Sequence, residues 1–206
     1  RPARIDQRWV PYETISPLLR RAVLIAEDDA FFSHDGLDWN EIRASVRRNL
    51  AAGRVVRGGS TITQQLARNL YLGSPRTLTR KLKEIMLARR IERVLTKRRI
   101  FELYLNLIEW GDGVYGIEAA AGTHFGVSAA RLDARQAALL AAVIINPRRY
   151  DPVHPGRHIE RRARMILARM RRRGLLSEPE YLIAIGRAPQ PPALMRWLFG
   201  APADSS

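Results

Sequence analysis

Apolar residues recur at intervals of three and four along most of this chain, which is the spacing that places them on one face of an α-helix. The first such segment follows Ser16 and Pro17, a residue typical of a helix cap and a proline typical of a first turn. Its apolar positions include Leu18, Val23 and Ala26. The pattern therefore predicts a helix that starts near residue 17.

Start and stop signals divide the rest of the chain into further helices. The sequence from Asp38 to Glu41 resembles a capping box, and Gly53 would end the helix that it starts. The other predicted helices cover residues 61–71 and 77–95, a segment that starts at Thr96, residues 137–145 after a capping box at 133–136, residues 161–173, and a last helix capped at 177–180. A tight loop is expected around Gly111, Gly113 and Gly116.

This organisation favours an all-α fold, because no strand alternation is convincing and no internal repeat is present. We expect one domain over residues 1–187, followed by a proline-rich tail over residues 188–206.

Composition narrows the classes of protein that fit. The 206 residues carry a net charge of +15, which attracts polyanions such as nucleic acid, anionic lipid or phosphate-bearing substrates. A solvated basic surface explains the same charge. The absence of Cys excludes disulfides and thiolate metal sites. No run of about 18 apolar residues predicts a membrane-spanning helix.

An acidic turn follows the first predicted helix. Glu27, Asp28 and Asp29 stand where the apolar pattern ends, and acids at the C-terminal end of a helix oppose its dipole. A local rule that is broken without evident gain points to function, although a solvated acidic turn is the simpler explanation of this feature alone.

Two further segments carry polar groups suited to a ligand. The glycines at 58 and 59 precede a helix with Ser60, Thr61, Gln64 and Gln65, where free backbone N–H groups and neutral side chains suit sugars or phosphates. The cations Arg76, Arg80, Lys81 and Lys83 surround Glu84 and could hold a diphosphate. An N-capped helix and a surface ion-pair ladder are the corresponding structural explanations.

Together these segments resemble the peptidoglycan glycosyltransferase family. The stretch from Glu27 to Gly36 looks like its first motif, and residues 58–66 look like its second. Residues 80–84 match the third, residues 102–106 with Gly111, Gly116, Ala120 and Ala121 resemble the fourth, and residues 137–147 with Tyr150 and Pro152 resemble the fifth. The ordered set covers roughly residues 9–170 and is more similar to the monofunctional branch than to the bifunctional penicillin-binding proteins.

The resemblance implies a lysozyme-like helical lobe and a smaller jaw near residues 38–57 beside the membrane. Arginines of the jaw would meet anionic headgroups. The apolar residues Trp39, Ile42, Val46 and Leu50 could face either the core or lipid. This chain differs from the family pattern in two ways. Arg68 stands where the family usually has Lys. The family's N-terminal membrane helix is not among these residues, so we expect an anchor upstream.

The implied reaction joins Lipid II to a growing glycan strand with inversion at the anomeric carbon. Glu27 is the expected general base. Glu84 is expected to orient the cations or the donor. The remaining expected site residues bind substrate, and they are Asp28, Ser60, Thr61, Gln65, Arg68, Asn69, Arg76, Arg80, Lys81 and Lys83.

No resident metal site and no tightly bound cofactor are expected, but a divalent cation, Mg²⁺ or Mn²⁺, could assist at the substrate diphosphate. The expected partners are Lipid II, the glycan strand, an anionic membrane surface and other cell-wall synthesis proteins, without nucleic acid. The expected location is the periplasmic side of the bacterial inner membrane.

Two alternatives stay open on the sequence. A lysozyme-like enzyme that cleaves glycan shares a helical fold and a catalytic Glu, but it needs no cations for a diphosphate. A basic nucleic-acid-binding domain would bind in a strongly salt-dependent way without needing Glu27. The chain shows no interleaved aromatic platform of the kind that single-strand binders use.

Overall fold

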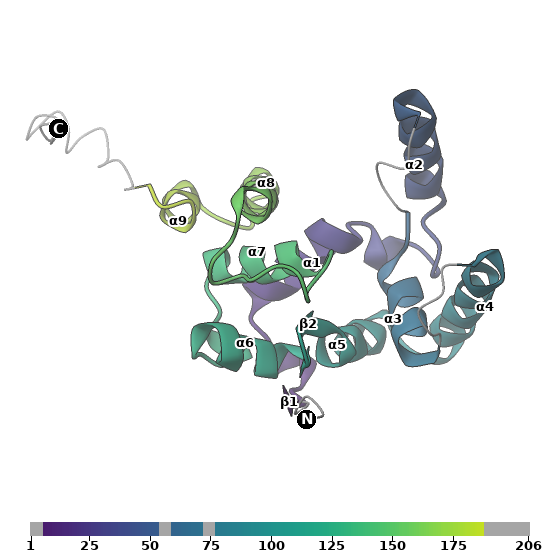
Figure 1. Cartoon of the computed structure of the whole chain (residues 1–206), viewed down its shortest axis with the longest axis horizontal. Helices are drawn as coiled ribbons and strands as arrows, with labels where there is room; N and C mark the ends of the chain where they lie inside the picture. The colour runs from purple at the N-terminus through teal and green to yellow at the C-terminus, as the bar shows by residue number, and fades with distance from the viewer. Residues whose placement is uncertain (1–5, 54–58, 72–76, 188–206) are drawn as a thin grey trace, which may run out of the picture.

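A computed structural model describes residues 6–53, 59–71 and 77–187 of the chain (Figure 1). In the described residues the helices are α1 (Pro17–Glu27), α2 (Trp39–Ala52), α3 (Ile62–Tyr71), α4 (Leu78–Val94), α5 (Lys97–Leu107), α6 (Ile117–Phe125), α7 (Ala134–Val143), α8 (Arg157–Arg172) and α9 (Glu178–Ala184). Three 3₁₀ turns cover Tyr12–Thr14, Phe31–Ser33 and Ala129–Arg131. The prediction of an all-α fold is confirmed.

Capping side chains set where several helices begin. The predicted capping boxes at Asp133 and Ser177 are both present, with each side chain bonded to the backbone three residues on. Asp38 likewise accepts a hydrogen bond from the Glu41 N–H at 2.8 Å. Ser16 does not cap α1 with its side chain, because its hydroxyl donates to the Leu132 carbonyl instead.

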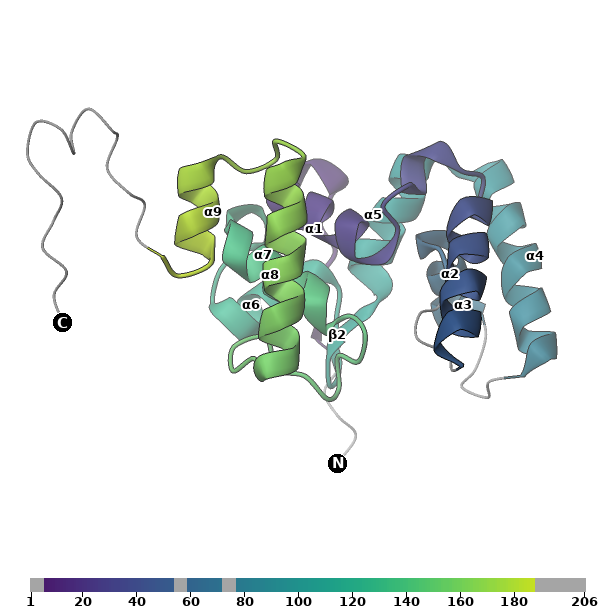
Figure 2. The same cartoon turned by 90° about the horizontal axis from the view of Figure 1, so that it is seen from above.

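The helices form two groups that α5 joins. Figures 1 and 2 show α1 and α6 to α9 on one side and α2 to α4 on the other. In the first group α7 packs against both α1 and α8, and in the second α3 packs against α4 and α5. Helix α2 projects from the second group (Figure 1).

The main core lies around α7, whose residues from Ala137 to Val143 are all buried. Its alanines let the neighbouring helices approach closely, and large side chains such as Trp110, Phe31 and Phe101 fill the remaining space. The C-terminal end of α1 is attached to this core through Val23 and Ile25, which are buried. The acidic turn after α1 therefore starts from a rigid position.

A small sheet lies at the edge of the helices, which the hydrophobic pattern did not predict. It consists of β1 (Asp6–Gln7), β2 (Glu109–Gly111) and β3 (Val114–Tyr115) in the order β1-β3-β2. β1 pairs with β3 in parallel, and β2 pairs with β3 antiparallel across the predicted glycine loop. Strands of two or three residues are too short to show alternation in a sequence.

Other boundaries differ modestly from the sequence pattern. Helix α8 begins at Arg157 rather than 161, because Ile159 extends its buried face by one turn. In α2, Trp39, Val46 and Leu50 are exposed by 57%, 51% and 77%, so these three side chains do not belong to the core. No helix within the described ranges is both long and apolar enough to cross a membrane.

Candidate active site

A cleft of about 660 Å³ opens beside the C-terminal end of α1. Its walls come from the acidic turn, the start of α2, the start of α3, the segment after α7, and one residue of α8. The lining residues that matter below are Glu27, Asp28, Asp29, Ser60, Thr61, Gln65, Arg68 and Arg162.

Glu27 is the last residue of α1, and its carboxylate faces this cleft from a nearly buried position, with 11% of the side chain exposed. Its Oε1 accepts a hydrogen bond from Arg162 Nη2 at 2.9 Å. Its Oε2 accepts one from Gln65 Nε2 at 3.1 Å. Both oxygens are thus held by side chains from two different helices, α8 and α3, and each retains a lone pair for another partner.

The orientation of the Gln65 amide is itself set by a buried tyrosine. Tyr104 donates its hydroxyl hydrogen to Gln65 Oε1 at 3.0 Å, which leaves the amide nitrogen to face Glu27. Burial, followed by the charge of Glu27, raises the pKa of the Tyr104 phenol well above its ordinary value. The phenol therefore stays protonated and remains a donor.

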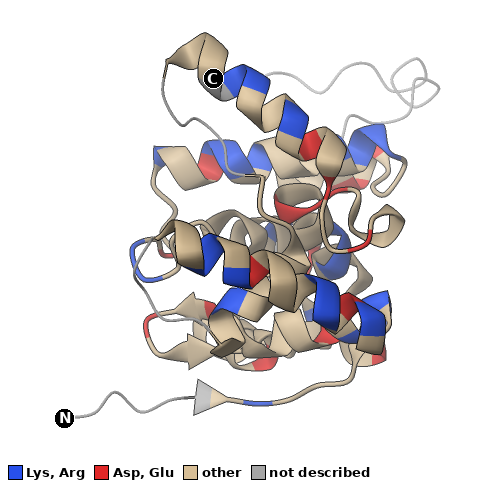
Figure 3. Cartoon of the chain, turned by 90° about the vertical axis from the view of Figure 1, so that its right-hand side faces the viewer, with Lys and Arg blue, Asp and Glu red and all other residues tan. Residues whose placement is uncertain are grey.

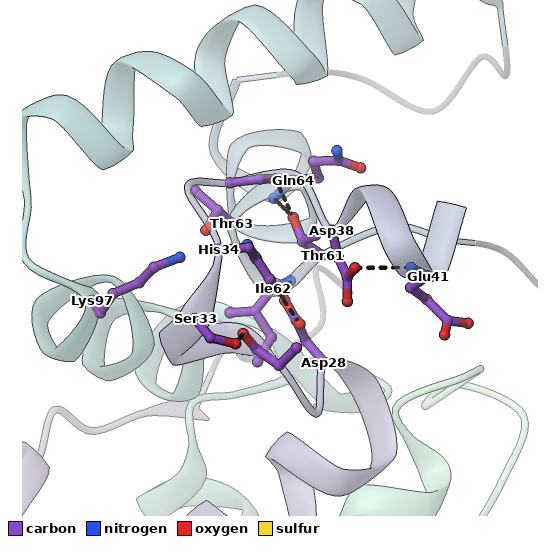
Figure 4. A network of polar contacts seen from close by, with 12 residues as sticks. Asp28, Ser33, His34, Asp38, Glu41, Thr61, Ile62, Thr63, Gln64 and Lys97 are labelled. Carbon is purple, nitrogen blue, oxygen red and sulfur yellow. Dashed lines mark hydrogen bonds and ion pairs between the residues drawn. The ribbon is translucent and has the colours of Figure 1, made fainter. Parts of the chain in front are cut away.

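Asp28, which also lines the cleft, connects three segments of the chain through its carboxylate (Figure 4). Its carboxylate contacts His34 Nε2 at 2.9 and 3.1 Å and accepts from the Ile62 N–H at 3.0 Å. An acidic group at the first N–H of α3 also complements the helix dipole. Thr61 contributes to the same junction, since its hydroxyl donates to the Gly36 carbonyl at 2.7 Å.

One group of side chains in the described residues has the spacing of a metal site. Asp28, His34 and Asp38 offer ligand atoms that lie within 4.8 Å of one another. Each already has a protein partner, because Asp28 and His34 bond to each other and Asp38 caps α2.

A second cavity of about 620 Å³ continues from the cleft and shares Gly59, Ser60 and Arg68 with it. Arg80, Lys81 and Glu84 line this cavity. Glu84 is buried, with 3% of its side chain exposed, and pairs with Arg80 at 3.2 Å and with Lys81 at 3.1 Å. Glu27 and Glu84 therefore belong to adjoining cavities with shared walls.

Lys81 has all its N–H groups engaged. Besides Glu84, its ammonium donates to Ser60 Oγ and to Gln64 Oε1, both at 2.9 Å. An ammonium has three N–H groups, so none is left for a ligand in this arrangement. Because the Ser60 oxygen accepts from Lys81, the Ser60 hydroxyl hydrogen remains available to donate.

Arg68 lies where three cavities meet. It lines the cleft, the cavity of Glu84, and a third cavity of about 620 Å³ that Asn69, Arg80, Tyr104 and Arg148 also line. Within the described part of the chain Arg68 makes no hydrogen bond and no ion pair. Its guanidinium is thus a partly exposed positive charge that is not neutralised by a protein carboxylate.

Two of the expected substrate-binding cations are not placed in these cavities. Arg76 lies outside the described residues, as does Gly58, the first glycine of the segment that precedes α3. Lys83 is exposed on α4 and lines none of the three cavities. The structure brings together the other expected site residues around the cleft and its two extensions.

Sequence reasoning missed Arg162 and the role of Tyr104. Arg162 stands 135 positions after Glu27, so no local pattern connects the two. A signal was present nevertheless: Arg162 follows Ile159 by three positions and precedes Ile166 by four, which places a charged residue on the buried face of α8.

The chain thus forms a helical domain with one cleft beside the end of α1. In this cleft the Glu27 carboxylate is held by two hydrogen bonds, and the cleft continues to the Arg68 guanidinium, which has no carboxylate partner in the described residues. A family model described as transglycosylase matches residues 2–171. The chain belongs to this transglycosylase family, and it is a glycosyltransferase.

Similar proteins carry a consistent name. The biosynthetic peptidoglycan transglycosylase of Chromobacterium violaceum is 49% identical over 168 residues, which are 82% of this chain and 74% of the relative. That of Methylobacillus flagellatus is 51% identical over 169 residues, with the same coverage.

A solved structure, penicillin-binding protein 1A from Haemophilus influenzae, is 27% identical and covers 59% of this chain. The match spans 16% of that longer chain, and its TM-score of 0.39 is too low to support an argument about the fold.

Proposed function

We propose that this chain polymerises Lipid II into β-1,4-linked glycan strands and releases polyprenyl diphosphate. The observation that carries the proposal is the Glu27 carboxylate, held by Arg162 and Gln65 in a cleft that continues to Arg68 and Arg80. The names of the relatives agree with it, since they are peptidoglycan transglycosylases.

Glu27 acts as the general base in this proposal. The 4-hydroxyl of the acceptor sugar attacks the anomeric carbon of the donor, and Glu27 takes the hydroxyl proton. The bond from the anomeric carbon to the diphosphate breaks, and the diphosphate leaves with the electron pair. Attack from the face opposite the leaving group converts the α-linked donor into a β-linkage.

The leaving diphosphate needs positive charge that is already in place. Arg68 supplies it where the three cavities meet, and Arg80 adds a second guanidinium in two of them. We expect Arg76 to contribute in the same way and Asn69 to contact the donor. The planar guanidinium of Arg68 can bind two phosphate oxygens at once, which the usual Lys of the family cannot.

Glu84 and Lys81 serve mainly to position other groups in this proposal. The buried Glu84 carboxylate fixes Arg80 and Lys81, and Lys81 in turn fixes Ser60. We propose that the Ser60 hydroxyl then donates to a sugar or phosphate oxygen. Asp28 and Thr61 hold the acidic turn against the start of α3.

We propose no resident cofactor for this reaction. Arg68 and Arg80 have no lone pair to offer a metal, so a Mg²⁺ or Mn²⁺ in this part of the cleft would be held by the diphosphate oxygens. Such a cation would add positive charge at the leaving group.

The proposal includes a location at the periplasmic face of the inner membrane, where the lipid-linked substrate is found. Its support is the exposed apolar surface of α2 and α4, which includes Leu50, Leu78 and Leu82, with Arg43 and Arg47 among the exposed cations of α2. Figure 3, which views the side of α2 and α4, shows many Lys and Arg positions along the helices. Apolar side chains with neighbouring cations suit an anionic bilayer surface.

The central experiment compares the wild-type chain with Glu27→Gln on labelled Lipid II, with glycan products resolved on a gel. We expect the variant to keep its melting temperature and to polymerise at least about a hundredfold more slowly, the usual scale for losing a general base. Glu178→Gln is the matched control, because the Glu178 side chain is 57% exposed on α9.

Two outcomes would contradict the proposal. Near-normal turnover by Glu27→Gln would remove Glu27 from the role of base. Release of fragments from purified sacculi, with no turnover of Lipid II by the wild type, would indicate the glycan-cleaving alternative instead.

A further inference from the structure

The C-terminal end of α1 carries a negative charge, although the helix dipole favours a positive charge there. Glu27 is the last residue of the helix, and the last turn of α1 contains no basic residue. The partial negative charge of the unsatisfied carbonyl groups at this end repels a carboxylate. A positive charge from outside α1 would offset this repulsion and hold the Glu27 side chain in place.

Arg162 of α8 supplies the missing positive charge at this helix end. One nitrogen, Nη2, donates both to Glu27 Oε1 at 2.9 Å and to the Ala26 carbonyl at 3.4 Å. It therefore binds the carboxylate and one of the last carbonyl groups of α1 together. Cations near the end of a helix stabilise it in this way.

The stem of Arg162 is held by the packing of α8. Ile159, Ala163 and Ile166 on the same face are buried, and α8 packs against both α7 and α1. The Arg162 side chain itself is 21% exposed, and its Nε atom is buried without a partner in the described structure. Leaving a buried donor unpaired has a cost, which indicates that the orientation is dictated by the contacts of Nη2.

We propose that Arg162 is a positioning residue for the base: it fixes the Glu27 carboxylate at the wall of the cleft and offsets the dipole at the end of α1. This inference rests on the proposed role of Glu27. Gln65, oriented by Tyr104, holds the other oxygen, so the loss of Arg162 frees only one side of the carboxylate.

The test compares Arg162→Gln, Arg162→Lys and the control Arg161→Gln in steady-state polymerisation of Lipid II. Arg161 is the neighbouring residue of α8 and is exposed, so its change removes one positive charge without touching Glu27. We expect Arg162→Gln to lower kcat by about ten- to a hundredfold, the scale of a misplaced catalytic group. The KM for Lipid II should change little.

The conservative variant and a double variant separate positioning from a general effect on folding. Arg162→Lys keeps the charge and should recover part of the lost kcat. In a Glu27→Gln background, Arg162→Gln should lower the residual rate by less than about threefold, because residues that act through one another are not additive. Melting temperatures are measured for every variant, and if Arg162→Gln does not fold, Arg162→Lys takes its place in the double variant.

The inference is overturned if kcat is unchanged in the Arg162 variant, or if its loss is equally large with and without the Glu27 carboxylate. Failure of the proposed function looks different: the wild-type chain itself would not polymerise Lipid II, or Glu27→Gln would be fully active.

Discussion

Gly116 is a single residue on which the packing of the segments around the site depends. It precedes α6 with a φ of +80°, a conformation that favours glycine. A Cβ at this position would lie 2.7 Å from the Asn106 carbonyl oxygen. Asn106 is fully buried, and its side chain bonds to both the N–H and the carbonyl of Val10. The N-terminal segment is thus attached to α5 at the point where Gly116 must pass closely.

We predict that Gly116→Ala lowers the free energy of unfolding by about 1–3 kcal/mol, through the left-handed backbone and the contact with Asn106. Gly122→Ala is the matched control within α6, where a Cβ meets nothing within 4 Å. That change should raise stability by about 0.5–1 kcal/mol, because alanine favours a helix interior over glycine. Urea unfolding of the two variants would contradict this account if both effects had the same sign.

The residues that line the cleft were easier to predict from the sequence than the residues that hold them in place. Glu27 stood out because an acid at a helix end breaks a local rule, and the structure places it in the cleft. Arg162 and Tyr104 act through contacts between distant segments, 135 and 39 positions from their partners. Such contacts depend on how the helices pack, which local periodicity does not specify.

At the scale of elements, helix starts were predictable because a cap is a local interaction. The boxes at Asp133 and Ser177 formed as the sequence pattern indicated. The short strands were not predictable, since β1 is stabilised by pairing with β3 more than a hundred residues later. The pattern on α2 identified an apolar stripe but not its environment, because exposure depends on what the rest of the chain covers.

We predict that Asp133→Ala lowers the free energy of unfolding by about 0.5–2 kcal/mol, because the Gln136 N–H then loses its acceptor at the start of α7. Asp133→Ser should lose much less, since serine also caps helices. Thermal unfolding followed by circular dichroism compares the two. Equal destabilisation by both changes would show that the cap is not the cause.

At the scale of the whole molecule, charge and apolar exposure act together. The chain carries 35 Lys and Arg against 20 Asp and Glu, so it is attracted to any anionic surface. The exposed apolar residues of α4, Leu78, Leu82 and Met86, are 86%, 63% and 64% exposed. Under the proposed location these residues would enter the bilayer interface while the cations meet headgroups.

We predict that Leu82→Ser lowers partitioning onto phosphatidylglycerol vesicles by about three- to tenfold, since full burial of a leucine is worth about 1.5–3 kcal/mol. Ile183→Ser on α9 is the matched control, because Ile183 is also 63% exposed but lies in the other helix group. Cosedimentation measures both, and higher salt should weaken binding of every variant. Equal losses for the two variants would place the contact surface elsewhere.

The two anchors of Glu27 come from opposite halves of the molecule, Arg162 from the group around α7 and Gln65 from α3. The Glu27 carboxylate is therefore a hydrogen-bonded link between the two helix groups. Because α1 packs against α8, Glu27 and Arg162 belong to the same helix group, so a relative movement of the two groups would break the hydrogen bond from Gln65 and leave the one from Arg162 in place.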